Sequence, residues 1–102
     1  MTDYSEAMSN VPNQMFNTNI NGHNFEFRFR TFRGIMYADV RVDGTLMQSG
    51  AKCIPNQPLF LGTVNALADG AFMFICMDEL YPSYELLDGT TCRFIYTPSS
   101  EA

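Results

Sequence analysis

The stretch His23–Phe32, with the sequence HNFEFRFRTF, decides the fold of this 102-residue chain. Phenylalanine occupies positions 25, 27 and 29, and a charged residue occupies positions 26, 28 and 30. Successive side chains of a β-strand point to opposite faces, so this alternation predicts a strand with three rings on one face and three charges on the other. We expect the rings to enter a hydrophobic core and the charges to face water.

Hairpin signals surround this strand. Asn21-Gly22 precedes it, and both residues tolerate the positive φ that a type I′ turn requires. After a turn at Arg33-Gly34, residues 35–42 alternate again, and Asp43-Gly44 begins the next hairpin. Residues 14–48 are therefore expected to form an antiparallel meander of about four strands, with one apolar face and one wet face.

The second half of the chain is less regular but also favours strands. The two prolines of the segment 54–60 exclude a central strand there, because proline lacks the N–H that a ladder needs. Residues 61–69 are expected to form a short helical turn or a loop. The apolar run 71–77 and the stretch 90–96 predict two more strands. The predicted fold is all-β, a small antiparallel barrel or sandwich of about six to seven short strands.

The length predicts one domain. We expect a single β domain over residues 11–97, with a flexible N-terminal arm at 1–10 and a flexible C-terminal tail at 98–102. The acidic N-terminus lacks the pattern of a signal peptide. No apolar run approaches the roughly 20 residues of a membrane span, so no membrane partner is expected.

The charge balance bears on possible partners. A net charge of −5 disfavours nucleic acid, because phosphate binding needs a concentrated surplus of basic residues. The bases are nonetheless clustered, and this suits docking to an acidic protein neighbour. Four arginines fall within fourteen residues: Arg28, Arg30, Arg33 and Arg41.

Three cysteines, Cys53, Cys76 and Cys92, are an odd number. Their spacing fits neither a disulfide framework nor a zinc site. We expect free thiols, with Cys76 buried as a small hydrophobe in its apolar run. Free thiols indicate a reducing compartment such as a cytoplasm.

No catalytic arrangement is evident. Nucleophilic catalysis needs a nucleophile beside an oriented base, but the one histidine, His23, follows a hairpin turn and is expected to be solvated. The adjacent carboxylates Asp78 and Glu79 lie in a turn-like stretch, where turn chemistry alone explains an aspartate. A small lysin would have to use these two residues. We therefore predict that the chain is not an enzyme, with no catalytic, cofactor-binding or metal-binding residues, no cofactor and no small-molecule substrate.

Assembly with other proteins remains as the main interpretation. Arg28, Arg30 and Arg41 share the wet face, and Tyr81 and Tyr84 are candidate anchors, since tyrosine is enriched in interfaces as well as cores. Exposed edge strands can pair with a neighbour. The alternative is a small OB-like adaptor module that binds single-stranded nucleic acid or a protein ligand. Strict alternation disfavours the OB-like module. A stacking platform needs arginines beside its rings, whereas the alternation places rings and arginines on opposite faces.

Several short motifs follow one another in a characteristic order. They are Val11-Pro12-Asn13-Gln14-x-Phe16, Asn21-Gly22, Asn24–Arg30, Tyr37-Ala38-Asp39-Val40, Asp43-Gly44, Ile54-Pro55-Asn56-Gln57-Pro58-Leu59, Phe72-Met73-Phe74, Asp78-Glu79-x-Tyr81-Pro82 and Leu87-x-Gly89-x-Thr91. Together they closely resemble the baseplate plug family of small proteins encoded by tailed phages and prophages. The resemblance covers about residues 11–96. One departure is that relatives often carry a tryptophan near the third strand, where this chain has Met36-Tyr37.

The resemblance implies a structural, non-enzymatic virion component of a contractile tail. Such a protein would plug or lock the central hub region of the baseplate through protein–protein contacts. Its expected partners are the hub, the spike, the tube and sheath initiators and the wedge. Its expected location is the virion tail baseplate, assembled in the host cytoplasm.

Overall fold

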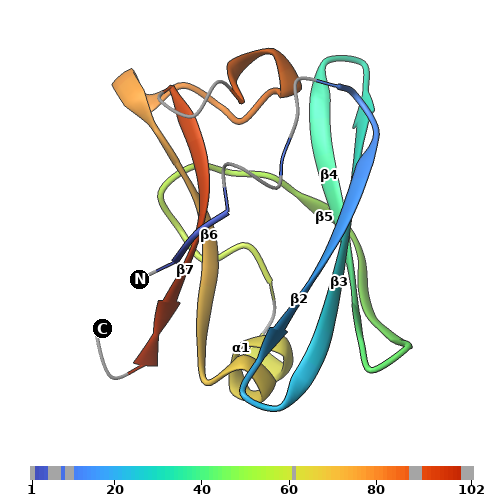
Figure 1. Ribbon diagram of the computed structural model, residues 1–102. Coiled ribbons are helices and arrows are strands. Elements are labelled where there is room, and N and C mark those ends of the chain that lie inside the picture. Colours follow the sequence, from blue (N-terminus) through green and yellow to red (C-terminus); the bar gives the residue numbers. More distant parts are fainter. Residues whose placement is uncertain (1, 5–7, 9–10, 61, 88–90, 100–102) are drawn as a thin grey trace.

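Two antiparallel sheets face each other across the hydrophobic core (Figure 1). The computed structural model describes residues 2–4, 8, 11–60, 62–87 and 91–99. Within these ranges the chain forms seven strands, one α-helix and two 3₁₀ turns. The predicted all-β fold is confirmed, and of the two expected architectures the sandwich is the one that forms.

The first sheet has the strand order β2-β3-β4-β5, with tight turns between consecutive strands. Both residues of each turn have positive φ, at Asn21-Gly22, Arg33-Gly34 and Asp43-Gly44. Type I′ turns need this conformation, and their twist matches that of the flanking strands. The predicted meander is confirmed, and its last strand continues to Lys52. The strands are β2 (Gln14–Ile20), β3 (His23–Phe32), β4 (Ile35–Val42) and β5 (Thr45–Lys52).

The second sheet has the order β1-β7-β6. The segment 54–60 covers the outer edge of β6, where the amides of Asn56 and Leu59 donate to the carbonyls of Phe74 and Phe72 at 2.7 and 2.8 Å. As predicted, the prolines of that segment lie outside any central strand. The elements are β1 (Thr2–Asp3), α1 (Gly62–Ala68), β6 (Gly70–Cys76), η2 (Met77–Glu79), η3 (Tyr84–Leu86) and β7 (Cys92–Pro98).

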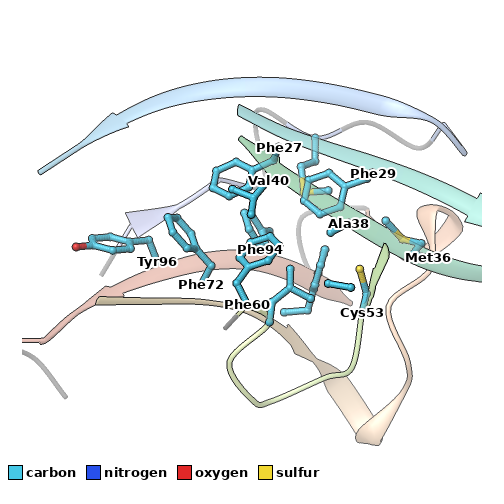
Figure 2. Close-up of a cluster of buried hydrophobic side chains, with 14 of the residues drawn as sticks. Phe27, Phe29, Met36, Ala38, Val40, Cys53, Phe60, Phe72, Phe94 and Tyr96 are labelled. Carbon is cyan, nitrogen blue, oxygen red and sulfur yellow. The ribbon is translucent and has the colours of Figure 1, made fainter. Parts of the chain in front are cut away.

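The core is built mainly from phenylalanine rings. Phe25, Phe27 and Phe29 are fully buried, so the predicted inward orientation of β3 is confirmed. Rings from β6 and β7 meet them from the opposite sheet (Figure 2). The centroid of the Phe27 ring lies 4.8 Å from that of Phe72 and 5.4 Å from that of Phe94, both in edge-to-face geometry. Such aromatic pairs add stabilisation beyond the area that they bury.

The cysteines correct one expectation from the sequence. Cys76 and Cys92 form a disulfide, and only Cys53 is a free thiol, buried in the core. The two bonded residues are direct partners in the β6–β7 register, with their Cα atoms 4.2 Å apart. Opposite positions of an antiparallel pair place side chains in contact, which sequence spacing does not show. The inference of a reducing compartment from three free thiols therefore loses its basis.

Some residues of the terminal segments have fixed contacts. Thr2 and Asp3, within the expected N-terminal arm, pair with Tyr96 and Ile95 of β7. Met8 is buried in the core cluster. Toward the other end, Pro98 closes β7 rather than opening a tail. Residues 1, 5–7, 9–10 and 100–102 of these segments lie outside the described residues.

Alkylation should distinguish the cysteines. Burial raises the pKa of the Cys53 thiol to about 12, which removes the reactive thiolate at neutral pH. Without reductant, iodoacetamide should add no label to the native chain and one to the unfolded chain, by intact mass. Reduction should add two more. The Cys53→Ala variant should take no label until it is reduced. More than one label on the unreduced, unfolded wild type would contradict the disulfide.

Truncating the central ring should be costly. Phe27→Ala removes a fully buried ring and leaves a cavity, so we expect a loss of about 3–5 kcal/mol in the free energy of unfolding. Urea unfolding followed by circular dichroism would measure it. The matched control, Phe32→Ala on the same strand, changes an exposed ring and should stay within about 0.5 kcal/mol. Equal losses in the two variants would refute the assigned core.

Candidate functional site

The outer face of the four-stranded sheet alternates positive and negative charge. Arg28 of β3 lies opposite Asp39 of β4, and Glu26 lies opposite Arg41. The three arginines expected on the wet face, Arg28, Arg30 and Arg41, are all exposed there. The structure therefore brings them together as predicted, but interleaves them with carboxylates.

Asp39 is the most engaged acid on this face. Its Oδ1 accepts from Arg30 Nη2 at 3.0 Å, from Ser49 Oγ at 3.0 Å and from the Gly50 amide at 2.8 Å. These contacts lie where the register between β4 and β5 shifts. The Asp39 carboxylate accepts the hydrogen bond of a backbone amide, that of Gly50, in place of a partner strand. Partial burial raises the pKa of Asp39, but the hydrogen bonds from Gly50 and Ser49 and the charge of Arg30 outweigh it. The net shift of the pKa is downward.

The arginines differ in their freedom to bind a partner. Arg41 Nε lies 3.5 Å from Glu26 Oε2, and Arg30 is held by Asp39. Arg28 has no ion pair among the described residues, and it lines a shallow depression of about 370 Å³ with Asn13, Gln14 and Met15. The three arginines are therefore mostly neutralised within the sheet, and Arg28 is the one of them without an ion pair among the described residues.

The two candidate tyrosines lie in different environments. Tyr81 is exposed after the η2 turn, with Lys52 Nζ 5.7 Å from the centroid of its ring. Tyr84 is half-buried and packs against the core cluster. Neither lies on the outer face of the four-stranded sheet. The five residues predicted from the sequence thus do not form one site.

His23 has a role that the sequence did not indicate. Its Nδ1 lies 2.6 Å from Asp43 Oδ2, and the Asn24 amide donates to Asp43 Oδ1 at 2.9 Å. These contacts tie the β2–β3 turn to the β4–β5 turn. The hydrogen bonds from Asn24 and His23 lower the pKa of Asp43. The contact between His23 and Asp43 therefore has a structural role, since it holds the two hairpin turns together.

Two other kinds of site are absent from the described residues. No three histidine, cysteine or acidic side chains in the described ranges are grouped so as to hold a metal ion. No helix among the described residues is long and apolar enough to cross a membrane. The backbone of Asp78, one of the adjacent carboxylates, adopts positive φ within η2.

The arrangement defines a small two-sheet β-sandwich whose exposed faces consist of paired charges and a few large apolar side chains. The family model described as "Cyanophage baseplate Pam3 plug gp18" matches residues 4–99, which is nearly the whole chain. The chain therefore belongs to this family of phage baseplate plug proteins, and the resemblance read from its motifs is confirmed. No curated protein matches the sequence.

The Asp39 network predicts a specific pH dependence. A carboxyl whose pKa is lowered by folding stabilises the protein above its unfolded-state pKa and loses this contribution as the pH falls through the folded-state value. Asp39→Asn should therefore cost roughly 1 kcal/mol at pH 7, as expected for a charge-assisted hydrogen bond. Below about pH 4 the difference from wild type should shrink. Urea unfolding between pH 7 and pH 3 measures both variants.

The exposed Asp69→Asn provides the control, with an expected change under about 0.5 kcal/mol at pH 7. If Asp39→Asn lowered the free energy of unfolding by the same amount down to pH 3, the charge of Asp39 would not be what stabilises the irregular register between β4 and β5.

Proposed function

We propose that this protein is a structural component that plugs or locks the central hub region of a contractile phage tail baseplate. The observation that carries the proposal is the family match over residues 4–99. The structure supports it physically, since a sandwich with a densely packed aromatic core is a rigid body suited to filling a fixed space in an assembly. The proposed activity is binding, without catalysis, within a virion tail assembled in the host cytoplasm.

The proposed partners are the hub, the spike, the tube and sheath initiators and the wedge. Among the five predicted contact residues, Arg28 and Tyr81 are the best placed, because Arg30 and Arg41 are held by carboxylates and Tyr84 packs against the core. We assign the primary contacts to Arg28 and Tyr81, and supporting contacts to the other three. Residues 11–97 are proposed to act as one domain.

Strand β2 is the sheet edge best suited to pair with a partner strand. It runs in regular register with β3 and carries no charge and no proline. The outer edge of β6 is covered by the segment 54–60, and β5 has the irregular register and Lys52. Charges, bulges and coverage are the devices that protect an edge from pairing, and within the described part of the chain β2 has none of them.

The alternative of an OB-like module for single-stranded nucleic acid is weakened by burial. Such a module stacks bases on exposed rings beside a basic groove. Phe25, Phe27 and Phe29 are fully buried between the sheets, while the arginines lie on the other face of β3. Among the rings of β3, only Phe32 is exposed on the side of the arginines, and a single ring at the end of a strand does not make a stacking platform.

Virion analysis tests the proposed function. Deleting the gene from its phage or prophage should abolish complete contractile tails in electron micrographs, and a plasmid copy should restore them. Mass spectrometry of purified particles should find the chain in the tail fraction. Normal tails without the gene, or a chain found only with capsids or absent from particles, would refute the proposal.

A further inference from the structure

Large apolar side chains gather at one end of the sandwich. Among the described residues, eight large hydrophobic side chains are exposed, and six of them belong to this end. We define the apolar end as Val11, Phe32, Ile35, Met77, Leu80 and Tyr81. The other two are Met15, on the outer side of β2, and Leu46, in the β4–β5 hairpin at the opposite end (Figure 1).

The strand directions explain why these residues share an end. Phe27 and Phe29 of β3 contact Phe72 and Phe74 of β6 in the same order, so the two strands run the same way. The β3–β4 turn and the segment after β6 therefore lie at the same end of the sandwich, as Figure 1 shows. Lys52, at the end of β5, connects the two sheets there by lying over the ring of Tyr81.

The alternation of side chains along β3 and β4 explains why Phe32 and Ile35, which flank the β3–β4 turn, are exposed. Odd-numbered positions of β3 face the core from Phe25 to Phe29, so Phe32 falls on the outer side. Ile35 is its direct partner and also lies on the outer side, since the even-numbered residues of β4 are buried. Val11 joins them because Thr31 Oγ1 donates to the Pro12 carbonyl at 2.9 Å.

Two cations accompany the exposed rings. The Arg33 guanidinium lies 5.2 Å from the centroid of Phe32, and Lys52 Nζ lies 5.7 Å from that of Tyr81. Neither has a carboxylate partner among the described residues. The exposed acids Asp78 and Glu85 belong to the segment between β6 and β7, which also carries Met77, Leu80 and Tyr81. The apolar end thus carries one cation without a carboxylate partner beside each of its two exposed rings.

We propose that the apolar end is the docking surface for a different tail protein, which offers an apolar patch bordered by carboxylates that face Arg33 and Lys52. Soluble monomers rarely leave a large apolar patch with a polar rim uncovered unless it binds something. Phenylalanine, tyrosine, methionine and arginine are the residue types enriched at the centres of protein interfaces. The unpaired cations select an acidic border by charge complementarity.

A second copy of this chain fits the apolar end less well. Each copy has a net charge of −5, so two copies repel each other at long range. The inference rests on the proposed function, because it presumes that a tail assembly supplies the partner.

Incorporation into tails tests the docking surface. Phe32→Asp and Leu80→Asp place a charge in the apolar end, whereas Thr45→Asp and Leu46→Asp place one at exposed positions of the β4–β5 hairpin at the opposite end. Each gene replaces the natural copy, and mass spectrometry measures the chain in purified tails. The first pair should reduce incorporation at least tenfold, and the second pair less than twofold. Circular dichroism and thermal unfolding of the purified variants verify that all four fold.

The acidic border has its own measurement. Lys52 is the single lysine of the chain, so a carbodiimide, which joins an amine directly to a carboxylate, reports what faces it. In wild-type tails, Lys52 should become linked to an aspartate or glutamate of another tail protein. Linkage only within its own chain would contradict the acidic border.

The outcomes separate the two proposals. Equal incorporation of all four variants would overturn the docking surface while leaving the baseplate function intact. Absence of the wild-type chain from tails would overturn both. A wild-type dimer in light scattering that Phe32→Asp dissociates would replace the proposed partner with a second copy.

Discussion

The fold depends on the contact between Phe27 and the rings of the opposite sheet. This side chain lies at the centre of β3 and meets Phe72, Phe94 and Phe60, with centroid distances between 4.8 and 5.8 Å. A domain of this size buries only about 60–65% of the surface of its unfolded chain, so a few large rings must supply much of the stabilisation. The chain has no tryptophan, and eight of its nine phenylalanines, all except the exposed Phe32, take that role.

The inward orientation of these rings determines the surface. Because side chains alternate along a strand, burying Phe25, Phe27 and Phe29 sends Glu26, Arg28 and Arg30 into water. The outer face is then largely neutralised by its own pairs, such as Arg30 with Asp39. Exposed apolar side chains remain at the strand ends, where Phe32 lies on the face of β3 opposite to the buried rings. The apolar end and the core are thus two consequences of one alternation.

The structure also explains how a small chain protects most of its sheet edges. Two bridging residues of the segment 54–60, Pro55 and Pro58, contact β6, and the two-residue strand β1 lies along β7. The irregular register of β5 is held by Asp39. Strand β2 has no comparable protection from the residues that the structure describes. A protein whose role is to join an assembly can leave an edge and an end open, because its partners cover them.

The sequence by itself determined the four-stranded meander and the buried face of β3, because hairpin turns and alternation are local properties. It also placed Arg28, Arg30 and Arg41 on one face, and it indicated the baseplate plug family. Only the tertiary structure decided which charges pair, that Cys76 meets Cys92, and that Phe32 and Tyr81 share one end. These facts depend on strand register and on how the two sheets stack. Contacts between segments far apart in the chain leave no periodic signal in the sequence.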